Sequence, residues 1–183
     1  MSVNWRGVMP AVTTKFTDDD QLDLDMFERN IQAQLDAGVT GIILGGTLGE
    51  ASTLEEEEKR TLVREAVRIV NGKVPVIINI AEQTTKGAIE AARKAEEDGA
   101  SGLMMLPPMR YKADDRETVV YYKAVAQSTH LPIMVYNNPV DYGIEVTHDM
   151  FEELLRDCPN IEAVKESTRD LSNTTRLRNR FGD

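Results

Sequence analysis

The hydrophobic positions of this chain alternate between two patterns. Short, nearly continuous runs rich in Val, Ile, Leu and Met are typical of buried strands, and longer stretches with apolar residues three or four positions apart are typical of amphipathic helices. The runs predict strands at 7–14, 39–44, 74–80, 102–106, 131–136 and 161–165. The longer stretches predict helices at 23–37, 52–71, 84–98, 115–128, 147–157 and 171–181. Each strand is thus followed by a helix, in repeats of about 30 residues.

Several helix ends carry capping residues. Gly38 and Gly99 follow the first and third helices, and glycine commonly ends a helix. Thr53 and Glu56 have the spacing of a capping box at the start of the second helix. Thr147 is the expected N-cap of the fifth.

Successive βα units predict an α/β protein with a parallel sheet and helices outside it. Two architectures fit: an open doubly wound sheet and a (βα)₈ TIM barrel. A barrel typically needs ~250 residues, and this chain has 183, so periodicity and length by themselves favour the open sheet. No linker, low-complexity segment or charge block interrupts the repeat, which predicts a single domain over residues 1–183.

Composition narrows the class of function. The 21 Lys and Arg against 31 Asp and Glu give a formal net charge of −10, which disfavours a nucleic-acid partner. No apolar run approaches the ~20 residues that span a bilayer, and the first residues lack the apolar core of a signal peptide. We therefore expect no membrane partner and a cytoplasmic location. The single Cys158, with His130 and His148 far apart, predicts neither a disulfide nor a metal site.

In parallel βα proteins the working residues lie at the carboxyl ends of the strands. Lys165 is the one lysine of this chain that closes an apolar strand. Burial favours the neutral form of an amine, and a neutral amine can attack a ketone to form a Schiff base. The alternative is a structural lysine that pairs with Glu162 or Glu166, or that extends its charge to solvent.

Two hydroxyl residues are predicted to accompany this lysine. Tyr136 closes the neighbouring strand, so its phenol can lie near Lys165 and pass protons. Thr47 follows the second strand and can orient that phenol. The alternative for Tyr136 is a core tyrosine whose hydroxyl bonds the backbone.

A glycine-rich loop at 45–50 offers a different function. In an open sheet, Gly45 and Gly46 would bring backbone amides close to a phosphorylated metabolite. The loop matches neither dinucleotide-binding nor Walker spacing, and the loop after the first strand, 13–17, contains no glycine.

Four segments together resemble one enzyme family. Gly46-Thr47-Leu48-Gly49-Glu50, Tyr136-Asn137-Asn138-Pro139, Val164-Lys165-Glu166-Ser167-Thr168 and the opening 7–16 resemble the dihydrodipicolinate synthase / N-acetylneuraminate lyase family, in order and at compatible spacing. This resemblance favours the (βα)₈ barrel, of which the chain carries about six βα units. It implies class I lyase chemistry on pyruvate or a related 2-oxo acid, by aldol cleavage or condensation, dehydration or deamination.

The resemblance also implies roles for individual residues. Lys165 is the Schiff-base lysine, Tyr136 the proton-transfer tyrosine, and Thr47 the threonine linked to that tyrosine. The backbone amides of Thr47 and Leu48 hold the substrate carboxylate, and Asn138 is a further substrate-binding residue. No cofactor is implied beyond the covalent imine on Lys165, and the expected assembly is a homo-oligomer, a dimer or tetramer.

Three positions depart from the synthases of this family. Leu48 stands where they have a second hydroxyl residue, and Asp141 where they have an arginine for the second substrate. Tyr111 is displaced from their cross-subunit tyrosine. The segment 111–122 and the Tyr-Asn-Asn-Pro motif look closer to catabolic members, such as 1-pyrroline-4-hydroxy-2-carboxylate deaminase.

The length of the chain carries an expectation of its own. The sequence ends where strand seven of a barrel would begin, which predicts a fragment, an engineered truncation, an incomplete sequence record, or a barrel completed by a partner chain. A non-catalytic binding or regulatory protein that keeps the barrel sequence is the alternative to an enzyme.

Overall fold

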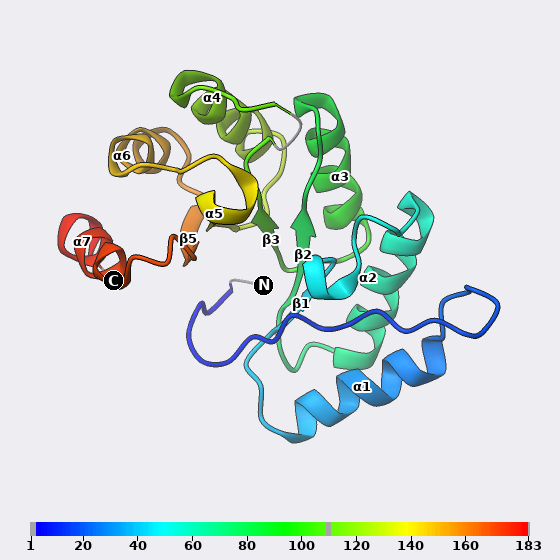
Figure 1. Cartoon of the computed structure of the whole chain (residues 1–183). Coiled ribbons are helices and arrows are strands. Elements are labelled where there is room, and N and C mark those ends of the chain that lie inside the picture. Colours follow the sequence, from blue (N-terminus) through cyan, green and yellow to red (C-terminus); the bar gives the residue numbers. More distant parts are fainter. Residues whose placement is uncertain (1–2, 109–110, 183) are drawn as a thin grey trace.

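The structure, a computed structural model, describes residues 3–108 and 111–182 and contains one parallel sheet (Figure 1). The strands, in spatial and chain order, are β1 (Ile42–Leu44), β2 (Val76–Ile80), β3 (Gly102–Met105), β4 (Ile133–Asn137) and β5 (Ile161–Glu166). The helices are α1 (Leu24–Asp36), α2 (Glu56–Val70), α3 (Thr85–Glu97), α4 (Asp115–Ala126), α5 (Pro139–Tyr142), α6 (His148–Asp157) and α7 (Leu171–Phe181), with a 3₁₀ turn at Thr47–Gly49.

The strand order separates the two predicted architectures. Every strand pairs in parallel with the next strand of the chain, and the order never reverses. A doubly wound sheet needs such a reversal, because its helices cover both faces. Here the helices form an arc outside the strands (Figure 1). The fold is therefore the α/β barrel type, with about six βα units, and the open sheet with its phosphate loop is not formed.

The predicted first strand, 7–14, is the main difference in secondary structure. It forms one isolated parallel bridge, Ala11 with Ile43, supported by hydrogen bonds from Val12 N to Ile43 O and from Ile43 N to Pro10 O. Pro10 has no N–H to donate, and Gly7 has a φ of 100°, so a regular ladder cannot extend along this segment. The segment still occupies the position of a strand beside β1.

The second helix begins later than predicted. Glu55 is its N-cap, and the Glu55 amide donates to the Glu58 carboxylate at 2.8 Å. Thr53 instead closes a turn, because its amide and its hydroxyl both donate to Glu50 O. The capping box predicted at Thr53 and Glu56 is therefore wrong by two residues. The N-cap predicted at Thr147 is confirmed.

Alternation along the strands gives two apolar layers. One set of side chains packs outward against the helices, including the fully buried Leu103 and Ile133. The other set points into the barrel, where Ile43, Ile77, Met104 and Met134 form the inner layer with Val3. Because strand side chains repeat every two residues, the positions two further along face the same interior at its carboxyl end. Those positions build the site.

Candidate active site

A small pocket lies at the carboxyl end of the barrel interior. Asn79, Leu106, Tyr136 and Lys165 each stand two residues beyond an inner-layer position. The pocket has a volume of about 140 Å³, and its lining consists of Ala11, Gly46, Thr47, Leu48, Asn79, Met104, Leu106, Tyr136, Tyr142 and Lys165. Four of the five residues predicted for the site, all except Asn138, therefore line one cavity.

Lys165 is half-buried on β5, and its Nζ lies 3.8 Å from the centre of the Tyr136 ring. The carboxylates that could pair with it are engaged elsewhere. Glu162 accepts a hydrogen bond from Trp5 Nε1, and Glu166 accepts from Asn137 and Asn173. Among the described residues no carboxylate forms an ion pair with Lys165, so the predicted structural alternative through Glu162 or Glu166 is not the one formed.

Tyr136 lies directly opposite Lys165 in the pairing of β4 with β5. Its hydroxyl accepts a hydrogen bond from Asn138 Nδ2 at 3.2 Å. Asn138 is itself held as the N-cap of α5, a helix that the sequence pattern did not predict. Asn138 does not line this pocket, and its hydrogen bond holds the Tyr136 hydroxyl.

Thr47 has a different partner from the predicted one. Its Oγ1 lies 3.0 Å from the hydroxyl of Tyr142, at the end of α5. Tyr142 in turn packs edge-on against Tyr136, with ring centroids 5.7 Å apart. The expected hydrogen bond between Thr47 and Tyr136 is therefore replaced by a contact through Tyr142. The short α5 helix brings this second tyrosine into the site, and Pro139 at its first turn was the available signal.

The loop after β1 presents backbone amides to the pocket. Gly45 has a φ of 62°, and a side chain there would collide with Ile78 Cδ1 at 2.9 Å. Thr47 and Leu48 open the 3₁₀ turn, where N–H groups have no acceptor within the turn. Leu48 is 67% exposed and lines the pocket beside Thr47.

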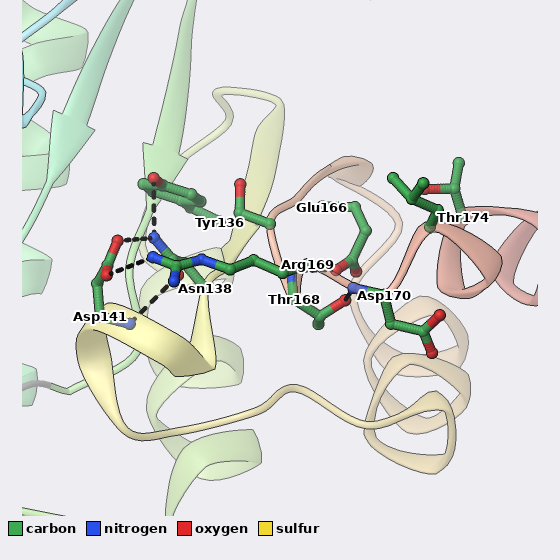
Figure 2. Close-up of a pocket in the computed structure, with 10 residues that line it drawn as sticks. Tyr136, Asn138, Asp141, Glu166, Thr168, Arg169, Asp170 and Thr174 are labelled. Atoms are coloured by element: carbon green, nitrogen blue, oxygen red, sulfur yellow. Dashed lines mark hydrogen bonds and ion pairs between the residues drawn. The ribbon is translucent and has the colours of Figure 1, made fainter.

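A second pocket of about 350 Å³ shares Tyr136 with the first and opens toward solvent (Figure 2). Asp141 and Arg169 form an ion pair of 3.3 Å in its wall, and Asn138 donates to Asp141 at 2.8 Å. Arg169 has a φ of 65°, a conformation that a long side chain rarely adopts. The carboxylate at position 141 is therefore matched by a cation from the loop after β5.

Some sequence expectations concern other parts of the molecule. Among the described residues, no group of three His, Cys, Asp or Glu side chains is arranged to hold a metal ion. His148 bonds Asn173. None of the described helices has both the length and the apolar character needed to cross a membrane. Residues 109–110, in the segment where the family's cross-subunit tyrosine was sought, lie outside the described residues, and Tyr111 is exposed.

The fold and the site define a βα-barrel protein with a lysine, two tyrosines and a threonine at the carboxyl end of its strands. Comparison with known proteins names the group more narrowly. The chain belongs to the dihydrodipicolinate synthetase family, whose sequence model matches residues 4–183.

Relatives of known name agree with this assignment. The chain is 38% identical over 168 residues to a 4-hydroxy-tetrahydrodipicolinate synthase of Exiguobacterium sibiricum, covering 92% of this chain and 57% of that protein. It is 34% identical to the synthase of Thermotoga neapolitana, covering 94% and 58%. The chain thus spans somewhat more than half the length of these relatives. Their names give no support to the predicted closeness to catabolic deaminases.

Solved structures share the fold. Dihydrodipicolinate synthase from Aquifex aeolicus has a TM-score of 0.93 at 30% identity, covering 98% of this chain and 61% of that one. A prophage protein of the same family from E. coli K12, in complex with pyruvate, has a TM-score of 0.90 at 30% identity, covering 95% and 58%. A monomeric dihydrodipicolinate synthase variant, reported as the first such variant, has a TM-score of 0.91 at 33% identity, covering 95% and 58%.

Proposed function

We propose that the protein is a lysine-dependent Schiff-base lyase that acts on pyruvate or a related 2-oxo acid. The observation that carries this proposal is Lys165, a strand-end lysine with its Nζ over the Tyr136 ring and no paired carboxylate among the described residues. Family membership supports the class of chemistry, and the pyruvate complex of the E. coli relative supports the class of substrate.

The first step is imine formation. The neutral amine of Lys165 attacks C2 of the 2-oxo acid, forming a C–N bond while the carbonyl oxygen takes up a proton. Loss of that hydroxyl as water then gives the imine. In this proposal Tyr136, whose ring lies against Lys165 Nζ, supplies the proton to the oxygen and receives the proton that leaves the nitrogen.

The carboxylate of the substrate binds at the loop after β1. The backbone amides of Thr47 and Leu48, at the start of the 3₁₀ turn that lines the pocket, are the groups proposed to hold this anion. The hydrogen bond between Thr47 and Tyr142 joins the loop to α5. In this proposal C2 of the acid lies between the loop and Lys165.

Once the imine forms, a proton at C3 becomes acidic, and its removal gives an enamine. The enamine can add to an aldehyde, or it can expel a hydroxyl or amino group from C4. These outcomes correspond to aldol chemistry, dehydration and deamination. In this proposal the part of the substrate beyond C3 extends toward the Asp141–Arg169 pair in the adjoining pocket, and this pair bears on the choice.

Family membership also supports a proposal about the oligomeric state of the protein. A relative whose monomeric state is singled out implies that other members associate, and we infer a homo-oligomer of single-domain barrel subunits.

Covalent capture tests the proposal. The protein is incubated with pyruvate and reduced with borohydride, and its peptides are then weighed by mass spectrometry. We expect a stable adduct on Lys165, no adduct in Lys165→Ala, and an unchanged yield in Lys86→Ala, whose lysine is exposed on α3. Binding of pyruvate without any adduct would contradict the proposal and indicate a non-catalytic binding protein.

A further inference from the structure

Tyr142 joins two parts of the reaction pocket that the sheet does not join. It ends α5, which follows β4, and its hydroxyl lies 3.0 Å from Oγ1 of Thr47, which follows β1. The strands β1 and β4 are not neighbours in the sheet, and 95 positions of sequence separate the two residues. Both residues line the pocket that contains Lys165. The hydroxyl contact is therefore a tertiary link within the site.

The loop after β1 is anchored at its two ends by buried side chains. Gly45 O accepts a hydrogen bond from Asn79 Nδ2 at 3.0 Å, and Gly49 O accepts one from Thr14 Oγ1 at 2.6 Å. Both donor side chains belong to residues that are more than nine-tenths buried. These bonds fix where the loop leaves and rejoins the body of the protein, and they leave its middle to be fixed by other contacts.

The middle of this loop carries the groups proposed to bind the substrate carboxylate. The backbone amides of Thr47 and Leu48 donate to no acceptor among the described residues. Both residues are exposed, and in the described part of the chain the one side-chain hydrogen bond of Thr47 is the bond with Tyr142. The orientation of these amides over the pocket therefore depends on Tyr142.

Tyr142 is itself held in place by α5 and by a neighbouring ring. Its amide donates to Asn138 O at 3.1 Å, and Gly143, with a φ of 74°, ends the helix directly after it. Its ring packs edge-on against the ring of Tyr136. A side chain that is already ordered loses little further freedom when its hydroxyl forms a hydrogen bond. Tyr142 is thus suited to restrain a more exposed partner.

We propose that Tyr142 is a positioning residue of the reaction, whose hydroxyl holds Thr47 and thereby sets the loop amides for the carboxylate of the 2-oxo acid. This inference rests on the proposed imine at Lys165. It gives the two tyrosines separate tasks, because Tyr136 acts on proton transfer and Tyr142 acts on substrate binding. A turn that is ordered in advance binds an anion more tightly than a mobile one, since less conformational freedom is lost on binding.

Borohydride capture of pyruvate on Lys165 separates these tasks. The rate of capture is measured over a range of pyruvate concentrations, which gives a maximal rate and a half-saturating concentration. Tyr142→Phe removes the hydroxyl and keeps the ring. We expect it to raise the half-saturating concentration about fivefold, the effect of one hydrogen bond, with a small change in the maximal rate. A merely structural role, through packing on Tyr136, predicts the opposite: a lower maximal rate and an unchanged half-saturating concentration.

A double-mutant cycle identifies the hydrogen bond itself. Thr47→Val removes the other hydroxyl of the same pair, keeps the backbone amide, and should raise the half-saturating concentration by a similar factor. The double variant Thr47→Val/Tyr142→Phe should bind pyruvate no more weakly than either single variant, because both changes remove one bond. If Tyr142→Phe does not fold, Thr47→Val carries the test, since it breaks the same bond from the other side.

Tyr121→Phe is the matched control. It makes the same chemical change on α4, outside this pocket, at a buried hydroxyl that has no hydrogen-bond partner among the described residues. Its maximal rate and its half-saturating concentration should both equal those of the wild-type protein.

The outcomes distinguish this inference from the proposed function. A wild-type half-saturating concentration in Tyr142→Phe, or a double variant whose effect is the product of the two single effects, overturns the role of Tyr142 and leaves the imine intact. The absence of any adduct with the wild-type protein overturns the imine at Lys165, and the role of Tyr142 with it.

Discussion

Tyr136 contacts both Lys165 and Asn138. Its ring lies under Lys165 Nζ, and its hydroxyl accepts from Asn138 at 3.2 Å. Asn138 also donates to Asp141, so its amide connects the Tyr136 hydroxyl to the wall of the second pocket. At the scale of single residues, this chain of contacts predicts that small changes at Tyr136 affect the rate of chemistry more than binding.

Tyr136→Phe should slow imine formation about 100-fold, because the ring and its packing remain but the proton carrier is lost. The rate at which the borohydride-trapped adduct forms with pyruvate measures this slowing. The pyruvate concentration that gives half-saturation should change little. Tyr142→Phe serves as the comparison. It removes the contact with Thr47 and should slow the reaction by less than Tyr136→Phe. Equal rates in wild type and Tyr136→Phe would exclude the phenol as the proton carrier.

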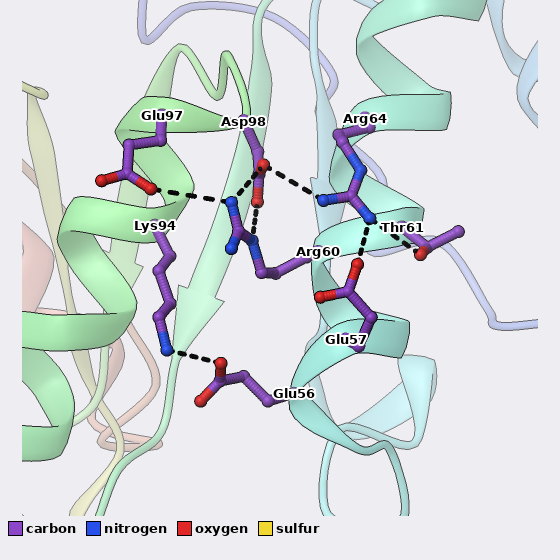
Figure 3. A network of polar contacts seen from close by, with 8 residues as sticks. All are labelled: Glu56, Glu57, Arg60, Thr61, Arg64, Lys94, Glu97 and Asp98. Carbon is purple, nitrogen blue, oxygen red and sulfur yellow. Dashed lines mark hydrogen bonds and ion pairs between the residues drawn. The ribbon is translucent and has the colours of Figure 1, made fainter.

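At the scale of elements, a polar network joins α2 to α3 (Figure 3). Arg60 donates to both oxygens of Asp98, at 2.7 and 2.8 Å, and Arg64 approaches the same carboxylate at 3.4 Å. Lys94 and Glu56 form a second link between the helices. Asp98 is only 5% exposed in its side chain, so its pair is far better shielded than an ordinary surface pair.

Asp98→Asn should lower the free energy of unfolding by about 2 kcal/mol at pH 7, because two charge-assisted bonds to Arg60 are weakened. Urea denaturation followed by circular dichroism measures this loss. Glu90→Gln is the control, since Glu90 forms an exposed pair with Lys86 and should cost no more than about 0.5 kcal/mol. Equal losses in the two variants would show that the Asp98 pair is no stronger than a surface contact.

The Asp98 carboxylate also predicts how the stability of the protein depends on pH. Its hydrogen bond to Arg60 holds the pKa of Asp98 below its ordinary value. A carboxylate whose pKa is lower in the folded state than in the unfolded state, where it is about 3.9, stabilises the folded protein above that unfolded pKa. This contribution is lost as the pH falls through the pKa of the folded state. The difference in stability between wild type and Asp98→Asn should therefore shrink at pH 3. A difference that stays constant from pH 7 to pH 3 would contradict this.

At the scale of the whole molecule, the first described segment of the chain contacts β5, the last strand of the sheet. Trp5 Nε1 donates to Glu162 Oε2 at 2.9 Å, a contact between the first segment and β5 over 157 positions of sequence. Trp5 also packs against the inner layer. Because the chain contains a single tryptophan, its fluorescence reports this contact directly.

Glu162→Leu should shift the emission of Trp5 and lower the free energy of unfolding by about 1 kcal/mol, since the indole loses its acceptor. Glu162→Gln keeps an acceptor and should change both quantities less. If both variants retain the wild-type emission and stability, the contact between Trp5 and Glu162 does not stabilise the fold.

Much of this protein could be predicted from local sequence. Five of the six predicted strands and six of the seven helices form within a few residues of their expected ends, because hydrophobic periodicity and capping are local properties. Lys165 could be singled out because a charged residue closing an apolar strand is visible in the sequence alone. The end of each strand also indicated which residues would share one edge of the sheet.

Tertiary structure decided which side chains form hydrogen bonds with one another. The hydrogen bonds of Thr47 with Tyr142, of Asn79 with Gly45 and of Trp5 with Glu162 each join segments far apart in the chain. Such contacts depend on strand register and on the curvature of the sheet, which bring distant residues together, and no local pattern records them. The sequence by itself therefore determined the repeating elements and the lysine at the end of an apolar strand, whereas only the tertiary structure determined which groups surround that lysine.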